Sequence, residues 1–127
     1  MCFADANIVL RYILNDHSEL YQRAIEIIEG NEIVLPFEVL CEVVFVLQKV
    51  YHVPREQIQI TLCDLIDNNV IAVEKKDVLK HALSIYSRKN IDIVDAFLWA
   101  YYVVEEKKIF TFDEKLLKFL KSPEEVK

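Results

Sequence analysis

Short apolar runs of β-like composition alternate with longer helical segments along this 127-residue chain. The expected strands are residues 2–4, 33–35, 70–73 and 108–111. The expected helices are residues 7–14, 17–29, 36–50, 54–67, 75–89, 92–107 and 114–121, followed by a frayed tail after Pro123. This alternation predicts a parallel sheet covered by helices on both faces. Because 54% of the residues are hydrophobic and no linker or repeat interrupts them, we expect residues 1–127 to form a single domain.

One acidic residue, Glu42, lies inside the unusually apolar run 39–47. In a helix its neighbours one turn away include Glu38 and Phe45 but no cation. A buried carboxylate without a partner is unfavourable, so it shifts its pKa, acquires a partner or binds a metal. The run therefore predicts a buried Glu42 with a functional reason for its charge.

Three further acids stand at the edges of apolar segments: Asp5, Asp95 and Asp113. Asp5 follows the first expected strand and Asp113 follows the last, and ligands of parallel sheets bind beyond the carboxyl ends of the strands. We hypothesise that these three acids and Glu42 converge on a divalent cation. The alternative for Asp5 and Asp113 is that each caps the helix that follows it.

Asp92 and Asp95 lie one helical turn apart with no base nearby. Helix capping explains Asp92 well, but Asp95 shares its face with Leu98 and Trp99 and is harder to explain in that way. Like charges at this spacing destabilise a helix, and a bound cation reverses that effect. The pair therefore supports a metal site, while the role of Asp92 as ligand or cap stays open.

The carboxylates have no cysteine or histidine companions at metal-binding spacing, because the three cysteines form no CxxC pair. An oxygen-only ligand set favours Mg²⁺ or Mn²⁺ over Zn²⁺. We expect Asp5 and Asp95 to coordinate most directly, and Glu42 and Asp113 to orient water or bind a second ion. Such a site suits metal-assisted phosphodiester hydrolysis.

Three polar residues near these acids are candidates for supporting roles. Asn7 can hydrogen-bond a carboxylate or a phosphate, or cap a helix, and Arg11 can contact phosphate or remain a solvated surface charge. Thr111, two residues before Asp113, supports the site or is a plain strand residue.

Charge and hydropathy restrict the remaining possibilities. A formal net charge of −6 argues against broad non-specific binding of nucleic acid, although local basic residues or a metal still permit a nuclease. No apolar run reaches the roughly 20 residues that span a bilayer, and no signal peptide is recognisable. We therefore expect a cytoplasmic protein.

Four segments, in order along the chain, resemble the blocks of PIN-domain ribonucleases, and most closely the VapC toxins of type II toxin–antitoxin modules. The segments are residues 5–12 (DANIVLRY), 39–47 (VLCEVVFVL), 92–98 (DIVDAFL) and 111–116 (TFDEKL). Each is weak alone, but four in register span nearly the whole chain. One departure is Leu116-Leu117, where many relatives carry a phenylalanine.

The resemblance implies a three-layer α/β/α sandwich around a central parallel β-sheet. It also implies a Mg²⁺- or Mn²⁺-dependent endoribonuclease whose acidic centre maps onto Asp5, Glu42, Asp95 and Asp113. The expected partners are an RNA substrate, a second copy in a homodimer, and a cognate VapB-like antitoxin that inhibits the acidic groove.

Three alternatives remain at this point. A receiver-like Mg²⁺-binding signalling domain normally has adjacent acids after its first strand, where Asp5 stands alone. A haloacid-dehalogenase-like phosphatase needs an acid two residues after the first aspartate, where this chain has Asn7. A catalytically silent PIN binding module is the third.

Overall fold

The structure, a computed structural model, describes residues 1–16 and 18–121. The first residue of one predicted helix, His17, and the predicted frayed tail after Pro123 lie outside the described residues. The chain divides into two compact units, residues 1–76 and residues 77–127. The prediction of a single domain stays a prediction.

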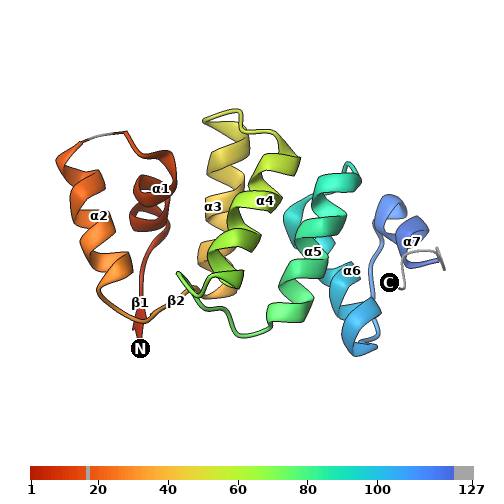
Figure 1. Cartoon of the computed structure of the whole chain (residues 1–127). Coiled ribbons are helices and arrows are strands. Elements are labelled where there is room, and N and C mark those ends of the chain that lie inside the picture. The colour runs from red at the N-terminus through yellow and green to blue at the C-terminus, as the bar shows by residue number, and fades with distance from the viewer. Residues whose placement is uncertain (17, 122–127) are drawn as a thin grey trace. The chain divides into compact units, whose positions relative to one another are not determined.

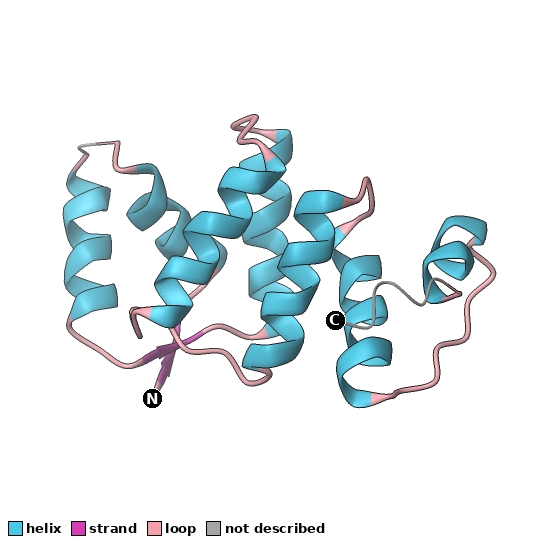
Figure 2. Ribbon diagram, turned by 45° about the vertical axis from the view of Figure 1, so that its right-hand side comes forward, coloured by secondary structure: helices cyan, strands magenta, loops and turns pink. Residues whose placement is uncertain are grey.

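The N-terminal unit contains a small parallel sheet. Strand β1 (Cys2–Phe3) pairs with β2 (Ile33–Val34), with Cys2 opposite Ile33 and Phe3 opposite Val34 (Figure 2). Ala72 adds an isolated parallel bridge to Val34, supported by hydrogen bonds from Leu35 N to Ala72 O and from Ala72 N to Ile33 O. The predicted strand over residues 70–73 is therefore reduced to one bridging residue.

Four helices complete this unit: α1 (Ala6–Leu14), α2 (Glu19–Glu29), α3 (Phe37–Lys49) and α4 (Arg55–Asp67). Helix α1 packs against α2 and α3, and α3 packs against α4 (Figure 1). The starts of α3 and α4 follow from Pro36 and Pro54, which sit at the N-cap positions with φ of −61°. Gly30 closes α2 as predicted.

Helix α5 (Lys76–Arg88), apart from its first residue, belongs to the C-terminal unit together with α6 (Ile93–Glu105) and α7 (Glu114–Leu120). The core of this unit includes Trp99, which is fully buried and stacks on Phe119 with ring centroids 4.6 Å apart. This aromatic contact joins α6 to α7. Among the described residues, no helix is long and apolar enough to cross a membrane.

The α/β class is confirmed, but the sheet is smaller than predicted. The strand predicted over residues 108–111 is wrong, because the chain from 106 to 113 carries no strand in the structure. A β-like composition forms a strand only where a neighbouring strand supplies hydrogen-bond partners. The described part of the C-terminal unit contains no other strand to pair with it.

Candidate functional site

Asp5 lies directly after β1 and caps α1. Its Oδ1 accepts a hydrogen bond of 3.1 Å from the backbone N of Ile8, and the side chain is exposed. The predicted capping role is therefore confirmed. Because the cap uses Oδ1, the second oxygen of the carboxylate is open to another ligand.

Glu42 is exposed on α3, so the prediction that it is buried was wrong. Helix α3 buries one side, formed by Leu40, Val43, Val44 and Leu47. Glu42 lies on the other side, one turn from Glu38 and from Phe45, which are also exposed. Solvent screens the repulsion between the two glutamates, which removes the electrostatic argument for a functional Glu42.

Asp95 has a carboxyl with a raised pKa. It is half-buried in the first turn of α6. Burial raises the pKa of its carboxyl, the charges of Asp92 and then Asp113 raise it further, and Lys115 partly offsets them. Within the C-terminal unit, Asp92, Asp113 and Lys115 thus each lie near enough to Asp95 to act on it by charge.

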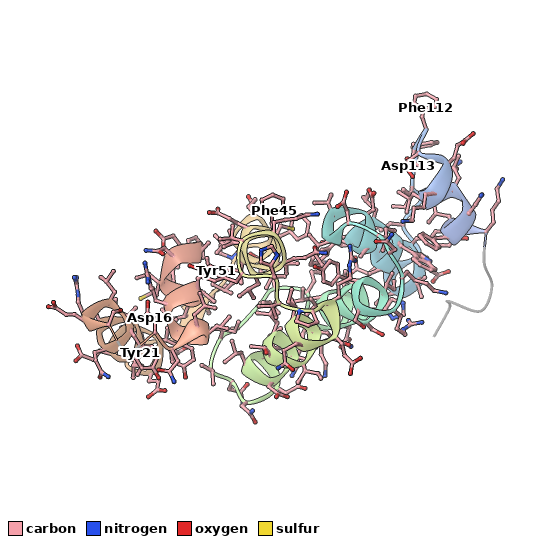
Figure 3. The ribbon with its side chains drawn as sticks, turned by 90° about the horizontal axis from the view of Figure 1, so that it is seen from above. Asp16, Tyr21, Phe45, Tyr51, Phe112 and Asp113 are labelled. Atoms are coloured by element: carbon pink, nitrogen blue, oxygen red, sulfur yellow. The ribbon has the colours of Figure 1, made fainter. Side chains whose placement is uncertain are left out.

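Asp113 caps α7 and is itself held in place by the chain before it. Its Oδ1 accepts from the backbone N of Leu116 at 2.8 Å, and its own N donates to Thr111 Oγ1 at 3.0 Å. Thr111 therefore orients the acid that follows it. Figure 3 shows Asp113 at the start of α7, next to the exposed Phe112.

Asp92 occupies the N-cap position of α6, but its side chain makes no capping hydrogen bond. The interpretation of Asp92 as an effective cap is thus only half right. Its exposed carboxylate acts on Asp95 by charge instead.

The two polar residues of the first block lie on α1. Asn7 is exposed, and Arg11 follows one turn later with a partly exposed side chain. Arg11 is paired with Asp16, a contact that the sequence did not indicate. The influence of Lys115 on Asp95 was not predicted either, although the position of Lys115 two residues after Asp113 indicates a cation near the proposed site.

The thiol of Cys41 is not activated as a nucleophile. None of the three cysteines forms a disulfide bond. Burial, and then the charge of Glu38, raise the pKa of Cys41 to about 11, so its thiol is protonated at neutral pH.

The four principal acids are divided between the units: Asp5 and Glu42 belong to the first, Asp95 and Asp113 to the second. Within residues 1–16 and 18–121, no three Asp, Glu, His or Cys side chains stand close enough to hold a metal ion. The donor chemistry nevertheless fits a hard cation, because these side chains offer only carboxylate oxygens.

A sequence model of the PIN domain family matches residues 2–121, which is nearly the whole chain. This protein belongs to the PIN domain family. PIN domains are generally metal-dependent nucleases, so membership indicates a nuclease and supports a divalent metal as its cofactor. The match also confirms the predicted PIN-like α/β fold. Neither the curated proteins nor the solved structures contain a significant match to the chain.

Proposed function

We propose that this PIN domain is an endoribonuclease that hydrolyses RNA phosphodiester bonds with Mg²⁺ or Mn²⁺. Asp5 and Asp95 hold the ion most directly, and Glu42 and Asp113 orient water or hold a second ion. Asn7, Arg11, Asp92 and Thr111 support the acids or the substrate. The metal supplies an activated water and neutralises charge at the phosphoryl group.

The observation that carries this proposal is the environment of Asp95. A half-buried carboxylate that faces two like charges is electrostatically unfavourable, and a raised pKa is the signature of that strain. Perturbed acids of this kind concentrate at functional sites. A bound divalent cation would relieve the repulsion that Asp92 and Asp113 exert on Asp95.

We further propose that the protein is the VapC-like toxin of a type II toxin–antitoxin module, inhibited by a VapB-like antitoxin and dimeric in the cytoplasm. The four-block resemblance supports this narrower assignment. So do three exposed apolar side chains of α3 and the residues after it: Phe45, Val50 and Tyr51 are 59%, 58% and 48% exposed. Exposed apolar side chains of this size favour contact with a protein partner.

The family match leaves the receiver-like and phosphatase alternatives without support. A catalytically silent PIN domain is the remaining competitor. It predicts RNA binding or protein binding without any metal-dependent cleavage.

The test is incubation of the purified, antitoxin-free protein with total RNA and Mn²⁺, followed by mapping of the cut sites. Glu42→Gln and Asp113→Asn each remove one proposed carboxylate. If each removes on the order of 3 kcal/mol of transition-state stabilisation, cleavage slows about 10²-fold.

Matched controls lie on the same helices. Glu38→Gln, one turn before Glu42, and Glu114→Gln, next to Asp113, neutralise exposed acids outside the proposed set. Both variants should keep full activity. Equal cleavage by all four variants contradicts the assigned roles, and absence of cleavage by the unmodified protein favours the silent module.

A further inference from the structure

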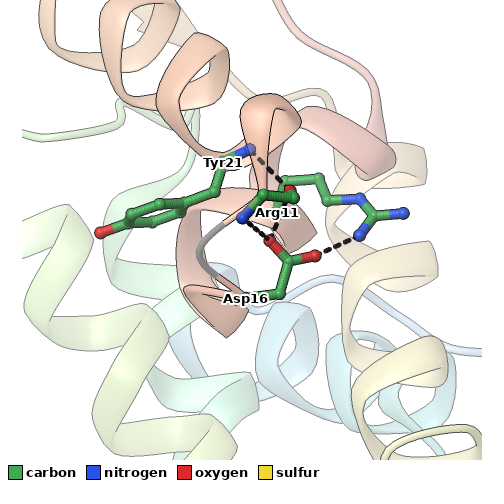
Figure 4. Close-up of polar contacts among 4 residues, drawn as sticks. Arg11, Asp16 and Tyr21 are labelled. Atoms are coloured by element: carbon green, nitrogen blue, oxygen red, sulfur yellow. Dashed lines mark hydrogen bonds and ion pairs between the residues drawn. The ribbon is translucent and has the colours of Figure 1, made fainter.

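The connection between α1 and α2 holds an arginine in a fixed orientation. Helix α1 ends at Leu14, and Asn15 at its C-cap adopts the left-handed conformation, with φ of 48°. This turn returns the chain so that Asp16 faces Arg11, which lies one turn before the end of α1 (Figure 4). Nη1 of Arg11 donates to Oδ2 of Asp16.

Asp16 is itself oriented from the other side. Its Oδ1 accepts from the backbone N of Ser18 at 3.1 Å and from Ser18 Oγ at 2.6 Å (Figure 4). Ser18 in turn caps α2 by accepting from the N of Tyr21 at 3.1 Å. The carboxylate thus gives one oxygen to Ser18 and the other to Arg11, so its position is set independently of the guanidinium.

These contacts also keep Asp16 ionised. The hydrogen bonds from Ser18, and after them the Arg11 guanidinium, hold the pKa of the Asp16 carboxyl below its usual value. At neutral pH the residue is therefore a permanently charged acceptor for Arg11.

The pairing occupies only part of the guanidinium. Among the described residues, Nε and Nη2 of Arg11 make no hydrogen bond, and the side chain is 34% exposed. These two donors form the edge with which arginine binds a phosphate through two parallel hydrogen bonds. Asn7 is exposed one turn earlier on the same face of α1, and Asp5 caps that helix.

Resting on the nuclease function proposed above, we propose that Arg11 forms a phosphate subsite for the RNA strand and that Asp16, fixed by Ser18, is its positioning residue. Arg11 lies six residues beyond Asp5, or about 9 Å along the helix axis. That separation suits a phosphate flanking the bond to be cut. Preorganising the guanidinium before RNA arrives reduces the side-chain freedom lost on binding.

The experiment measures KM and kcat for Mn²⁺-dependent cleavage of a short single-stranded oligoribonucleotide of mixed sequence. Arg11→Gln is expected to raise KM about tenfold with kcat unchanged, because it removes binding common to the ground and transition states. The slope of log(1/KM) against log[salt] should also become shallower by about 0.7, the value for one phosphate contact on a single strand.

Asp16→Asn tests the positioning role. The amide keeps an oxygen for Ser18 but no longer accepts from Arg11 through a charged oxygen. At about 0.15 M salt, where long-range charge effects are screened, KM should rise roughly threefold with an unchanged salt slope. In the Arg11→Gln background, Asp16→Asn should add nothing, because it acts through the missing guanidinium.

Tyr12→Phe is the structural control. It removes another tie between the same helices, the 2.8 Å hydrogen bond from Tyr12 Oη to Glu29 Oε2, without touching a cation. It should leave KM unchanged. An unchanged KM in Arg11→Gln, an additive double variant, or a Tyr12→Phe effect as large as that of Asp16→Asn each overturns the proposal. Absence of cleavage by the unmodified protein instead overturns the underlying nuclease function.

Discussion

Asp5 and Asp113 have the same local role in different units, but the chain that leads to each is held differently. Each follows a run of apolar character and caps the next helix by accepting the backbone N–H three residues on, at 3.1 and 2.8 Å. Residues 2–3 before Asp5 form a paired strand. Residues 108–112 before Asp113 form none, and Phe110 and Phe112 are almost fully exposed.

This difference distinguishes features that depend on neighbouring residues from features that depend on distant parts of the chain. An aspartate cap needs only its own backbone and the next turn, so it forms in both units. A strand needs a neighbour, and β2 supplies one only in the N-terminal unit. Electrostatics differ as well, because Asp113 contributes to the raised pKa of Asp95.

The largest expected effect is stabilisation of the fold by Mn²⁺, which tests whether Asp5 and Asp95 bind the same ion. Mn²⁺ at a hundred times its dissociation constant should raise the free energy of unfolding by about 2.7 kcal/mol. If Asp5 and Asp95 hold the same ion, as proposed, Asp5→Asn and Asp95→Asn should each lose most of that gain. Thermal unfolding followed by circular dichroism measures it.

Two other outcomes would lead to different conclusions. Retention of the gain in Asp5→Asn together with its loss in Asp95→Asn assigns the ion to the C-terminal unit alone. A flat titration of the unmodified protein contradicts the metal site altogether.

An effect of intermediate size is expected when either helix cap is removed, and it tests whether the two caps are equivalent. In metal-free buffer, Asp5→Ala and Asp113→Ala should each lower the free energy of unfolding by about 1 kcal/mol, because alanine cannot accept the capping hydrogen bond. Asparagine caps a helix as well as aspartate does, so Asp5→Asn and Asp113→Asn should be neutral in stability. Chemical denaturation provides the measurement, and equal losses in Ala and Asn variants would show that charge matters more than capping.

The smallest expected effect concerns Asp95. Since its pKa in the folded state is raised, its ionisation destabilises the fold as pH rises through that value. Asp95→Asn should therefore raise stability in metal-free buffer at neutral pH by about 0.3 kcal/mol, the size of a like-charge helical pair. The gain should vanish at pH values below the usual pKa range of aspartate, because the protonated Asp95 is then neutral, like the asparagine that replaces it.

Glu42→Gln is the matching variant in the other unit. Because Glu42 is exposed and has one like charge, Glu38, a turn away, its neutralisation should raise the free energy of unfolding at neutral pH by less than that of Asp95 does. A gain for Glu42→Gln as large as that for Asp95→Asn would refute the distinction between the two environments.

Local signals in the sequence predicted the helices well. Pro36 and Pro54 marked helix starts, and Gly30 marked an end. The apolar face shared by Asp95 and Trp99 correctly indicated an acid in a partly desolvated place. These features depend on residues within one or two turns, which a sequence displays directly.

Features that depend on distant residues were not predictable in the same way. Residues 39–47 are apolar on nearly every side, so their composition could not tell which way Glu42 points. The pairing of Arg11 with Asp16 requires the left-handed turn at Asn15. The strand expected at 108–111 required a partner that its own composition could not supply.

The stack of Trp99 on Phe119 makes the C-terminal unit optically distinct. Trp99 is the chain's sole tryptophan, and it is fully buried against the helix that Asp113 caps. Tryptophan fluorescence therefore reports on how α7 packs against α6. The N-terminal unit does not contribute to this signal, because it contains no tryptophan. Emission wavelength and quencher accessibility follow one unit without any attached label.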